Sequence, residues 1–528
     1  MKKLEGWILH PFLFGIYPVV ALLAHNIRQI VPLFGLRSLF FALVLTLVTL
    51  LVARLVMGNW RKAALVTTLA MLLFFTYGRL FVAIRGIYLF GFKLARHRLL
   101  FGLFGVILIG FSWMVYKKKN LLGWTRTLNL IGIIAVLLPV FQIAWYEIRT
   151  SYTYWQESIP QVSAADLGLS LPPGESPPDI YYIVLDTYTR ADAMQVNFDF
   201  DNSVFIDALT QKGFYVAACS RSNFASTYPS FTSFLNFNYL SDLNPEFVYP
   251  TGKVEDLYLY LQHNLAMQIL TDLGYKTVAF DSGYSPTDFR DVDYYYSPQT
   301  DAFGALTISG LNPFEVILMQ TSAGASLYDY SLNRPDLKVF FDYSYILYRN
   351  RMAYAMDKLP ETVSLQGPKF VFVHLLAPHN PFAFGENGEM IIRQFPFTLD
   401  DDRDVAYPKD YAAGYAAEVT YLNTRFQSIF DQILQNSPIP PIIIVQGDHG
   451  IPRIDSWHLP ILNAYYLPEN GVQSLYPTVS PVNTFRVIFN AYFGGQLEIL
   501  PDLACDSPED DPFHCVVVPD PNPTCIVP

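Results

Sequence analysis

The sequence predicts an N-terminal α-helical membrane module followed by an α/β globular domain whose central sheet is mainly parallel and covered by helices. Of the 528 residues, 52% are apolar, which is high for a soluble protein, and the excess lies before about residue 145. Beyond about residue 151, charged residues, prolines and turn residues occur as in ordinary globular chains. There, short β-rich apolar runs alternate with helical patterns, which is typical of a parallel sheet with helices on both faces.

Five apolar stretches in the first part are long enough to cross about 30 Å of hydrocarbon at about 1.5 Å per residue. They run from Trp7 to Ala24, Leu36 to Met57, Ala63 to Phe81, Leu99 to Tyr116 and Leu128 to Trp145. The first stretch lacks a small-residue cleavage site, so we interpret it as a span and not as a removable signal peptide.

The positive-inside rule places the N-terminus in the cytoplasm. The basic residues that then face the cytoplasm are Lys2, Lys3, Arg61, Lys62, Lys117, Lys118, Lys119 and Arg126. Five spans put the globular domain on the extracytoplasmic side of the cell membrane. A sixth span through Ile87 to Phe92 would reverse the domain, but Arg85 would then lie within the bilayer at a cost of a few kcal/mol.

Changes in composition divide the chain into a membrane module (1–150), a linker (151–178), an α/β domain (179–495) and a tail (496–528). The linker is polar, includes Pro172, Pro173, Pro177 and Pro178, and is expected to form a tether and an outer-surface helix. The tail holds Cys505, Cys515 and Cys525, whose spacing matches no zinc motif. A small disulfide-closed tail and a pair of free thiols both fit this pattern.

The predicted elements of the α/β domain alternate between strands and helices. The strands are 179–185, 214–218, 275–280, 369–375, 442–445 and 461–466, and the helices are 203–212, 228–235, 257–273, 411–435 and 482–492. The net charge of −11 belongs mainly to this domain, which has no cluster of Lys and Arg. Because binding to a phosphate backbone needs such clusters, nucleic acid is not an expected partner.

Four candidate ligands follow predicted strands, where the chemistry of a parallel sheet collects. Asp186 ends the first strand, Thr227 lies in the loop after the second, and Asp448 and His449 follow the strand IIIVQ in the motif GDHG. Two carboxylates, a hydroxyl and an imidazole suit one divalent metal ion such as Zn²⁺ or Mn²⁺. Each residue alone has an ordinary structural explanation, as a turn residue, a helix cap or a core histidine; only their order and common placement favour a site.

Thr227 is a candidate nucleophile. A threonine at the start of a helix can serve as N-cap, and Pro229 suits the first turn. The N-terminus of a helix presents unpaired N–H groups to a bound anion. A metal ion bound to the threonine oxygen would favour the alkoxide and make the hydroxyl a nucleophile. His374, by contrast, lies within a predicted buried strand and is expected to be a hydrogen-bonded core imidazole.

In their order, these motifs resemble the alkaline phosphatase and sulfatase superfamily, whose membrane branch includes lipoteichoic acid synthases and phosphoethanolamine transferases. The similarity covers roughly residues 178–495. The resemblance implies that Asp186, Thr227, Asp448 and His449 bind the metal and that Thr227 is transiently modified. It further implies that His379, in Pro-His-Asn-Pro, and His458, in Trp-His-Leu-Pro, contact the substrate ester or leaving group, so that both are catalytic.

At two places the sequence differs from related enzymes in a way that limits which reaction mechanisms it can use. Sulfatases oxidise a Cys or Ser in Cys/Ser-x-Pro-x-Arg to formylglycine, whereas this chain has Thr227 and, at the Arg position, Phe231. Two-zinc nucleotide phosphodiesterases have an Asp four residues before the histidine that corresponds to His379, and here that residue is Leu375. The sequence therefore favours a single-metal site like that of the lipid head-group transferases. The Thr-Ser pairing common in those transferases is absent from the nucleophile loop.

The leading hypothesis is that the enzyme transfers a phospho-alcohol head group, of phosphoglycerol or phosphoethanolamine type, from a membrane phospholipid to an envelope glycan or lipid through a phospho-threonine intermediate. One alternative is an extracellular phosphodiesterase, phosphatase or sulfuric ester hydrolase. Another is a catalytically decayed domain that serves only as an interaction module. Detection of a transferred head group on an acceptor would distinguish a transferase from a hydrolase. Detection of a bound metal ion would distinguish either enzyme from a decayed domain.

Overall fold

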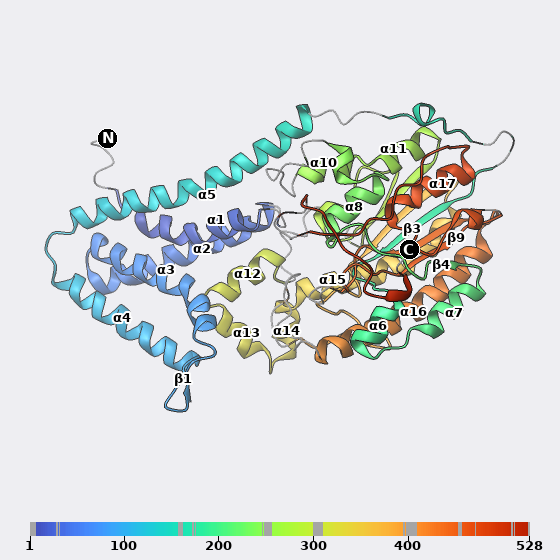
Figure 1. Cartoon of the computed structure of the whole chain (residues 1–528). Helices are drawn as coiled ribbons and strands as arrows, with labels where there is room; N and C mark the ends of the chain where they lie inside the picture. The colour runs from blue at the N-terminus through green and yellow to red at the C-terminus, as the bar shows by residue number, and fades with distance from the viewer. Residues whose placement is uncertain are drawn as a thin grey trace. The chain divides into compact units, whose positions relative to one another are not determined.

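The computed structural model (Figure 1) describes residues 7–27, 30, 32–156, 162–171, 174, 176–244, 247, 256–298, 310–393, 397, 409–451, 457–469, 471–507, 511 and 513–525. The chain forms two compact units. The first combines residues 1–156 with 301–346 and 393–398, and the second contains residues 157–300, 347–392 and 399–528. The polypeptide therefore passes between the units five times, after residues 156, 300, 346, 392 and 398.

The first unit contains the membrane module. Its helices are α1 (His10–His25), α2 (Leu36–Met57), α3 (Trp60–Ala83), α4 (His97–Lys117) and α5 (Leu122–Gln156). Four described segments are long and apolar enough to cross a membrane: Pro32–Met57, Trp60–Ala83, His97–Lys117 and Leu122–Ile148. They coincide with the second to fifth predicted spans, so the protein is a membrane protein with helices in its N-terminal part.

Helix α1 is shorter than these spans but packs inside the bundle. Its 16 residues extend about 24 Å, less than a typical hydrocarbon layer of about 30 Å. Near its start, His10 Nδ1 lies 2.6 Å from Thr68 Oγ1 in α3, and Asn129 Oδ1 in α5 accepts the His10 N–H at 2.8 Å. Near its end, Leu23 contacts Gly35 just before α2. α1 thus runs parallel to α3 and α5 and antiparallel to α2, and the first predicted span stays a prediction.

Helix α5 continues to Gln156, into the segment from residue 151 for which a tether and an outer-surface helix are expected. The chain has neither Gly nor Pro between Pro139 and Gln156 to end the helix earlier. Of the predicted linker, Ala165–Leu167 form a short 3₁₀ turn, and residues 172 and 173 lie outside the described residues.

Three helices that the sequence analysis did not predict, α12 (Pro313–Thr321), α13 (Ala325–Ser331) and α14 (Pro335–Phe341), belong to the same unit as the membrane helices. Glu315 of α12 forms an ion pair with Arg37 of α2 through both carboxylate oxygens. The cap residue Asn312 donates to the Phe34 carbonyl at 3.1 Å. The α12 backbone passes so close to Gly78 of α3 that a Cβ there would meet a carbonyl oxygen at 2.0 Å. α12 is therefore packed on the membrane helices.

The second unit is built on a seven-stranded sheet in the order β4-β9-β8-β3-β7-β5-β6. The strands are β3 (Ile180–Leu185), β4 (Tyr215–Val216), β5 (Lys276–Phe280), β6 (Tyr294–Tyr296), β7 (Lys369–Leu375), β8 (Ile442–Gly447) and β9 (Asn463–Tyr466). β3 runs parallel to β7 and β8, and β5 runs parallel to β6 and β7, whereas β9 is antiparallel to β4 and β8. The mainly parallel sheet confirms the predicted fold class.

Helices cover both faces of this sheet. Figure 1 shows α8, α10, α11 and α17 on one side of it and α6, α7 and α16 on the other. Their bounds, with those of α9 and α15, are α6 (Ala191–Phe198), α7 (Ser203–Gln211), α8 (Thr227–Leu235), α9 (Leu240–Leu243), α10 (Leu257–Gln262), α11 (Leu265–Asp272), α15 (Tyr343–Lys358), α16 (Lys409–Asn436) and α17 (Thr484–Tyr492). The predicted helix 257–273 is two helices because the side chain of Asn264 caps α11 by accepting the Met267 N–H at 3.0 Å.

The core on the α8 side of the sheet is rich in aromatic rings. Tyr182 of β3 stacks between Phe234 of α8 and Phe485 of α17, with ring centroids 5.5 and 5.3 Å away. All three side chains are buried. Packing at this density fixes α8, and with it the start of α8, against the ends of the central strands.

Candidate metal and nucleophile site

Strand register brings the two predicted carboxylates together. In the parallel sheet Leu185, the last residue of β3, pairs with Leu375 of β7 and with Gly447 of β8. Asp186 and Asp448 are the next residues on adjacent strands, at the same edge of the sheet. Their side chains continue the alternation that directs Ile180, Tyr182 and Val184, among others, into the core on the α8 side.

Backbone hydrogen bonds lock the turn around these carboxylates. Asp448 Oδ1 accepts the N–H groups of Thr187 at 3.0 Å and His449 at 2.8 Å. Thr187 has a φ of 60°, a conformation that is uncommon for a β-branched residue. The backbone strain at Thr187 is offset by the hydrogen bond from its N–H to Asp448, which this φ allows. Gly447 allows the close approach, since a Cβ there would meet the Tyr188 carbonyl oxygen at 2.3 Å.

His449 presents one ring nitrogen to the site. Its Nδ1 lies 2.8 Å from the carbonyl oxygen of Gly450, which can only accept, so the hydrogen is assigned to Nδ1. The free Nε2 lies 3.8 Å from Asp186 Oδ1, 3.6 Å from Asp448 Oδ2 and 3.4 Å from Thr227 Oγ1. All four residues predicted as metal ligands therefore converge.

Thr227 is the first residue of α8 and not its cap. Ser226, with φ −146° and ψ 159°, occupies the N-cap position, although its side chain makes no capping hydrogen bond. The suggestion that Thr227 caps the helix was wrong by one residue. The difference has a chemical consequence, because a capping hydroxyl would be occupied by a backbone N–H of its own helix, whereas Thr227 Oγ1 faces His449.

His374 of β7 is a site residue that the sequence analysis did not identify. It pairs with Val184 in register, and its Nε2 lies 3.9 Å from Asp186 Oδ2. Asp186, His374 and Asp448 each offer a ligand atom within 4.8 Å of the other two. We expected a hydrogen-bonded core imidazole, and the ring is buried with its Nδ1 2.8 Å from Thr287 Oγ1. The expectation was incomplete, because the other ring nitrogen faces Asp186. The signal was the alternation Phe370, Phe372, His374, which places the ring on the same face as Asp186.

The two residues that set this chain apart from its relatives also lie here. Phe231, at the position of the sulfatase arginine, is fully buried, and its ring centroid lies 4.6 Å from that of His374. Leu375, which replaces the aspartate of two-zinc enzymes, is buried one residue after His374 in β7, where alternation turns it to the opposite face. Neither side chain can bind a metal ion.

The electrostatics of the cluster fit a bound cation. Burial raises the pKa of Asp186 well above its ordinary value, the charge of Asp448 raises it further, and His449 lowers it. Asp186 Oδ1, Asp448 Oδ2 and His374 Nε2 are buried without a hydrogen-bond partner among the described residues. Burial lowers the pKa of His374 to about 4, so its ring is neutral at neutral pH. A divalent cation would satisfy all three orphaned atoms and offset the repulsion of the carboxylates.

The two predicted catalytic histidines lie near this cluster. His379 is half-buried and close enough to His374 for its charge to lower the pKa of that ring. The loop after it is fixed by buried Glu418 of α16, whose Oε1 accepts the N–H groups of Ala383 at 2.8 Å and Phe384 at 3.1 Å. The carbonyl oxygen of His458 accepts the Gly450 N–H at 2.6 Å, which holds this residue beside the GDHG turn.

His458 has a partner from the tail that the sequence analysis missed. Its Nε2 lies 3.1 Å from Oδ1 of Asp506, on the short strand β10 (Cys505–Asp506) that pairs with β11 (Val516–Val517). No sequence pattern marks Asp506, because its position depends on how the tail folds back onto the domain.

Two disulfides fasten the tail. Cys505–Cys515 closes a loop within it, and Cys219–Cys525 ties it to the loop that leads to Thr227. The four cysteines are therefore paired, which settles the alternative of free thiols that the sequence left open.

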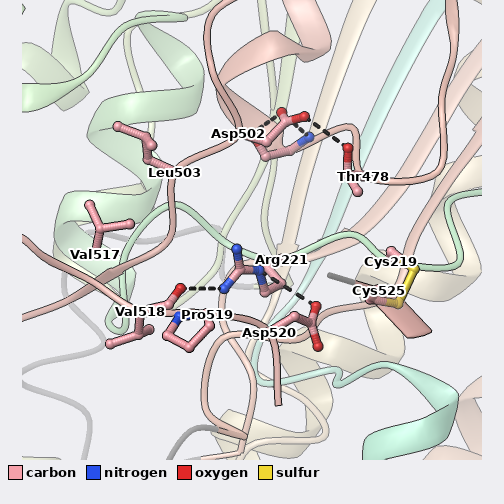
Figure 2. Close-up of a pocket in the computed structure, with 11 residues that line it drawn as sticks. Cys219, Arg221, Thr478, Asp502, Leu503, Val517, Val518, Pro519, Asp520 and Cys525 are labelled. Atoms are coloured by element: carbon pink, nitrogen blue, oxygen red, sulfur yellow. Dashed lines mark hydrogen bonds and ion pairs between the residues drawn. A yellow bond between two sulfur atoms is a disulfide. The ribbon is translucent and has the colours of Figure 1, made fainter. Parts of the chain in front are cut away.

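A pocket of about 450 Å³ lies between the tail and the loop that leads to Thr227. Figure 2 shows Arg221 of that loop donating to the Val518 carbonyl at 2.7 Å, with its Nε 3.6 Å from Asp520. Across the pocket, Asp502 accepts from Thr478 at 3.2 Å. The tail is thus part of the wall around the nucleophile loop and not a separate appendage.

Comparison with known proteins places this geometry in a family. The family model described as Sulfatase matches residues 178–474, more than half of the chain. No curated protein matches. Two similar solved structures have low sequence identity to this chain. One is the C-terminal periplasmic domain of EcEptC from Escherichia coli in complex with Zn, at 13% identity and a TM-score of 0.41 over 64% of this chain and 92% of that chain.

The other is lipooligosaccharide phosphoethanolamine transferase A, an integral membrane protein from Neisseria meningitidis, at 12% identity and a TM-score of 0.40. Here the match covers 92% of this chain and 95% of that chain. Together with the parallel sheet and the membrane helices, the matched domain identifies the chain as a sulfatase-like membrane enzyme. The chain belongs to the sulfatase family.

Proposed function

We propose that this protein is a membrane-anchored, metal-dependent transferase that moves a phospho-alcohol head group from a membrane phospholipid to an envelope glycan or lipid. The observation that carries the proposal is the position of Thr227 Oγ1. It lies 3.4 Å from His449 Nε2, beside two buried carboxylates and at the first position of a nine-residue helix. A hydroxyl in that place is suited to attack phosphorus.

Asp186, Thr227, Asp448 and His449 would hold one divalent ion, Zn²⁺ or Mn²⁺, with His374 as a further donor. When bound, the ion lowers the pKa of the threonine hydroxyl and neutralises charge on the phosphoryl oxygens. The Cys-free, oxygen- and imidazole-based donor set is compatible with either metal.

In the first step the Thr227 oxygen attacks as the alkoxide and bonds to phosphorus, the bond from phosphorus to the lipid oxygen breaks, and a protonated His379 or His458 supplies a proton to the departing alcohol. In the second step an acceptor hydroxyl attacks phosphorus, the bond to Thr227 breaks and returns the alkoxide, and the same histidine takes up the acceptor's proton. The positive end of the α8 helix dipole, at Thr227, would lie beside the negative phosphoryl oxygens in both steps.

Two features support an extracytoplasmic location for the catalytic domain. The helices α1 to α5 alternate in direction, so an N-terminus in the cytoplasm puts the end of α5 outside. All four cysteines are disulfide-bonded, which requires an oxidising compartment. An active site outside the membrane would meet lipid head groups of the outer leaflet.

Intact-mass analysis of the full-length protein in nanodiscs of phosphatidylethanolamine and phosphatidylglycerol tests the proposal. We expect one added head group, absent in Thr227→Ala and retained in Ser226→Ala, which removes the neighbouring hydroxyl without a capping bond. An unchanged adduct in Thr227→Ala would reject the nucleophile. Formation of the adduct followed by release to water, even with acceptor glycans present, would identify a hydrolase.

A further inference from the structure

The connection between α3 and α4 is a short hairpin with an apolar tip. Its strands, β1 (Tyr88–Leu89) and β2 (Phe92–Lys93), are antiparallel, with Leu89 opposite Phe92. The exposed fractions are 64% for Tyr88, 92% for Phe90 and 65% for Phe92. A hairpin with two residues in each strand has no core in which to bury such side chains. The tip therefore needs an apolar surrounding from outside the fold.

The turn itself does not explain the aromatic residue. Phe90 and Gly91 both have positive φ, 49° and 82°. Two-residue turns of this kind favour Asn or Asp followed by Gly, because a bulky side chain is disfavoured at positive φ. The sequence thus keeps a phenylalanine where hairpin formation favours a small polar residue, which indicates that the ring itself has a use.

A second group of exposed apolar side chains lies on α13, on the residue after it and on α14. Six side chains with exposed fractions from 38% to 59% form it: Leu327, Tyr330, Leu332, Leu337, Val339 and Phe340. Basic residues lie among them. The Arg334 guanidinium carbon is 5.6 Å from the centre of the Tyr330 ring, and Lys338 Nζ is 2.6 Å from Asp342 Oδ2. Apolar side chains interleaved with basic ones are typical of helices that lie in a membrane interface.

Both groups of side chains lie at the same end of the membrane module. The hairpin leads directly into α4, whose first residue is His97. His97 Nε2 lies 2.6 Å from Asp329 Oδ2, which fixes α13 to that end of α4. Figure 1 shows the hairpin projecting sideways from α4 and not along the helix axis. A sideways projection at the end of a span keeps the tip at the depth of the lipid head groups.

The lipid-facing surface of α4 continues into the hairpin. Leu99, Leu103 and Val106 of α4 are 52%, 53% and 70% exposed. Around the same end the chain carries Arg85, Lys93, Arg96, Arg98 and Arg334. Lipid phosphates carry the negative charge that complements these basic residues. A second protein at this place would have to cover a surface that is continuous with a membrane span.

We propose that the hairpin tip around Phe90 and the exposed faces of α13 and α14 are embedded together in the interfacial layer of the membrane leaflet at the α3–α4 connection. The occupant of this surface is phospholipid, with acyl chains around the aromatic tip and phosphates beside the basic residues. α12 to α14 lie in the chain between β6 and β7 of the catalytic sheet, so the polypeptide leaves that sheet to place a segment in the membrane interface. The inference does not depend on the chemistry proposed for Thr227.

Site-directed spin labelling of the full-length protein tests the proposal, and the absence of free thiols in the native chain makes an introduced cysteine selective. The variants are Phe90→Cys and Leu337→Cys, with Val106→Cys in α4 as the lipid-facing reference. Val204→Cys in α7, 77% exposed in the native protein, is the aqueous reference. Each is reconstituted in nanodiscs of phosphatidylcholine with a minority of phosphatidylglycerol.

We expect labels at 90 and 337 to collide more with oxygen than with a water-soluble nickel complex, as at 106, and the label at 204 to do the reverse. Nickel accessibility at 90 and 337 equal to that at 204 would overturn the proposal. Protection from both reagents, or broadening between labels in discs that hold two copies, would also overturn it, because either result would identify a protein partner.

Discussion

Nε2 of His374 lies 3.9 Å from Oδ2 of Asp186, while Nδ1 of the same ring lies 2.8 Å from Oγ1 of Thr287. The ring is thus held by a hydroxyl on one side and faces the carboxylate cluster on the other. This arrangement, one imidazole nitrogen fixed and the other presented, is the usual geometry of a metal-binding histidine. It makes His374 the first residue to test.

His374→Phe should lower kcat/KM about ten- to a hundredfold, because it keeps the ring packed against Phe231 but removes the nitrogen that faces the cluster. Thr287→Val, which removes only the orienting hydroxyl, should cost a few-fold. Activity and metal content measured on the purified full-length variants provide the comparison. A His374→Phe protein with undiminished metal content and rate would show that the ring serves packing alone.

Asp448→Asn should affect the stability of the metal-free protein and that of the metal-loaded protein differently. Without metal, the substitution removes one of two neighbouring buried carboxylates, so the melting temperature should rise. With metal at about 100 times its Kd, the wild type should gain roughly 2.7 kcal/mol and the variant nothing. Thermal melts with and without a chelator measure both effects. A chelator that left the wild-type melting temperature unchanged would argue against a bound ion.

Glu418 should give the protein a stability that depends on pH. Burial raises the pKa of Glu418 to about 8, and the N–H groups of Ala383 and Phe384 limit the rise. The native state then binds a proton that the unfolded state has released above its ordinary pKa of about 4.5. Stability should therefore fall by up to about 1.4 kcal/mol per pH unit as pH rises from about 5 to 8.

Glu418→Gln should flatten that dependence, since a neutral amide oxygen can still accept the two N–H groups. Melting temperatures of the wild type and the variant across this pH range provide the measurement. Parallel curves for the two proteins would assign the pH dependence to another group.

Asp506→Asn should lower turnover about tenfold with little change in melting temperature, because the Asp506 side chain is 49% exposed and contacts His458. The double variant Cys505→Ser, Cys515→Ser should lose a similar factor if the disulfide acts by holding β10 in place. Steady-state kinetics of the two proteins, with Glu498→Gln as a surface control, measure this. If the variant without this disulfide kept the full turnover rate, the tail would have no role in catalysis.

The sequence predicted Asp186, Asp448 and His449 as neighbours because parallel strands bring their carboxyl ends to one edge, a rule that needs only the order of elements. It missed His374, although the alternation Phe370, Phe372, His374 placed that ring on the face of Asp186. Asp506 could not be predicted, since it reaches His458 only through the fold of a tail that one long-range disulfide, Cys219–Cys525, ties to the domain. Helices α12 to α14 went unpredicted because they are short, and because the apolar residues of α12 pack on distant membrane helices whereas those of α13 and α14 include exposed ones.

The five passages of the chain between the two units have a practical consequence for anyone who wants a water-soluble fragment. A truncated protein that begins after Gln156 would still contain α12, whose Phe314 packs in one cluster with Leu22 of α1 and Phe75 of α3. Without those helices, Glu315 would lose Arg37 and the apolar side of α12 would meet solvent. Such a fragment should aggregate unless residues 310–346 are replaced by a short polar loop.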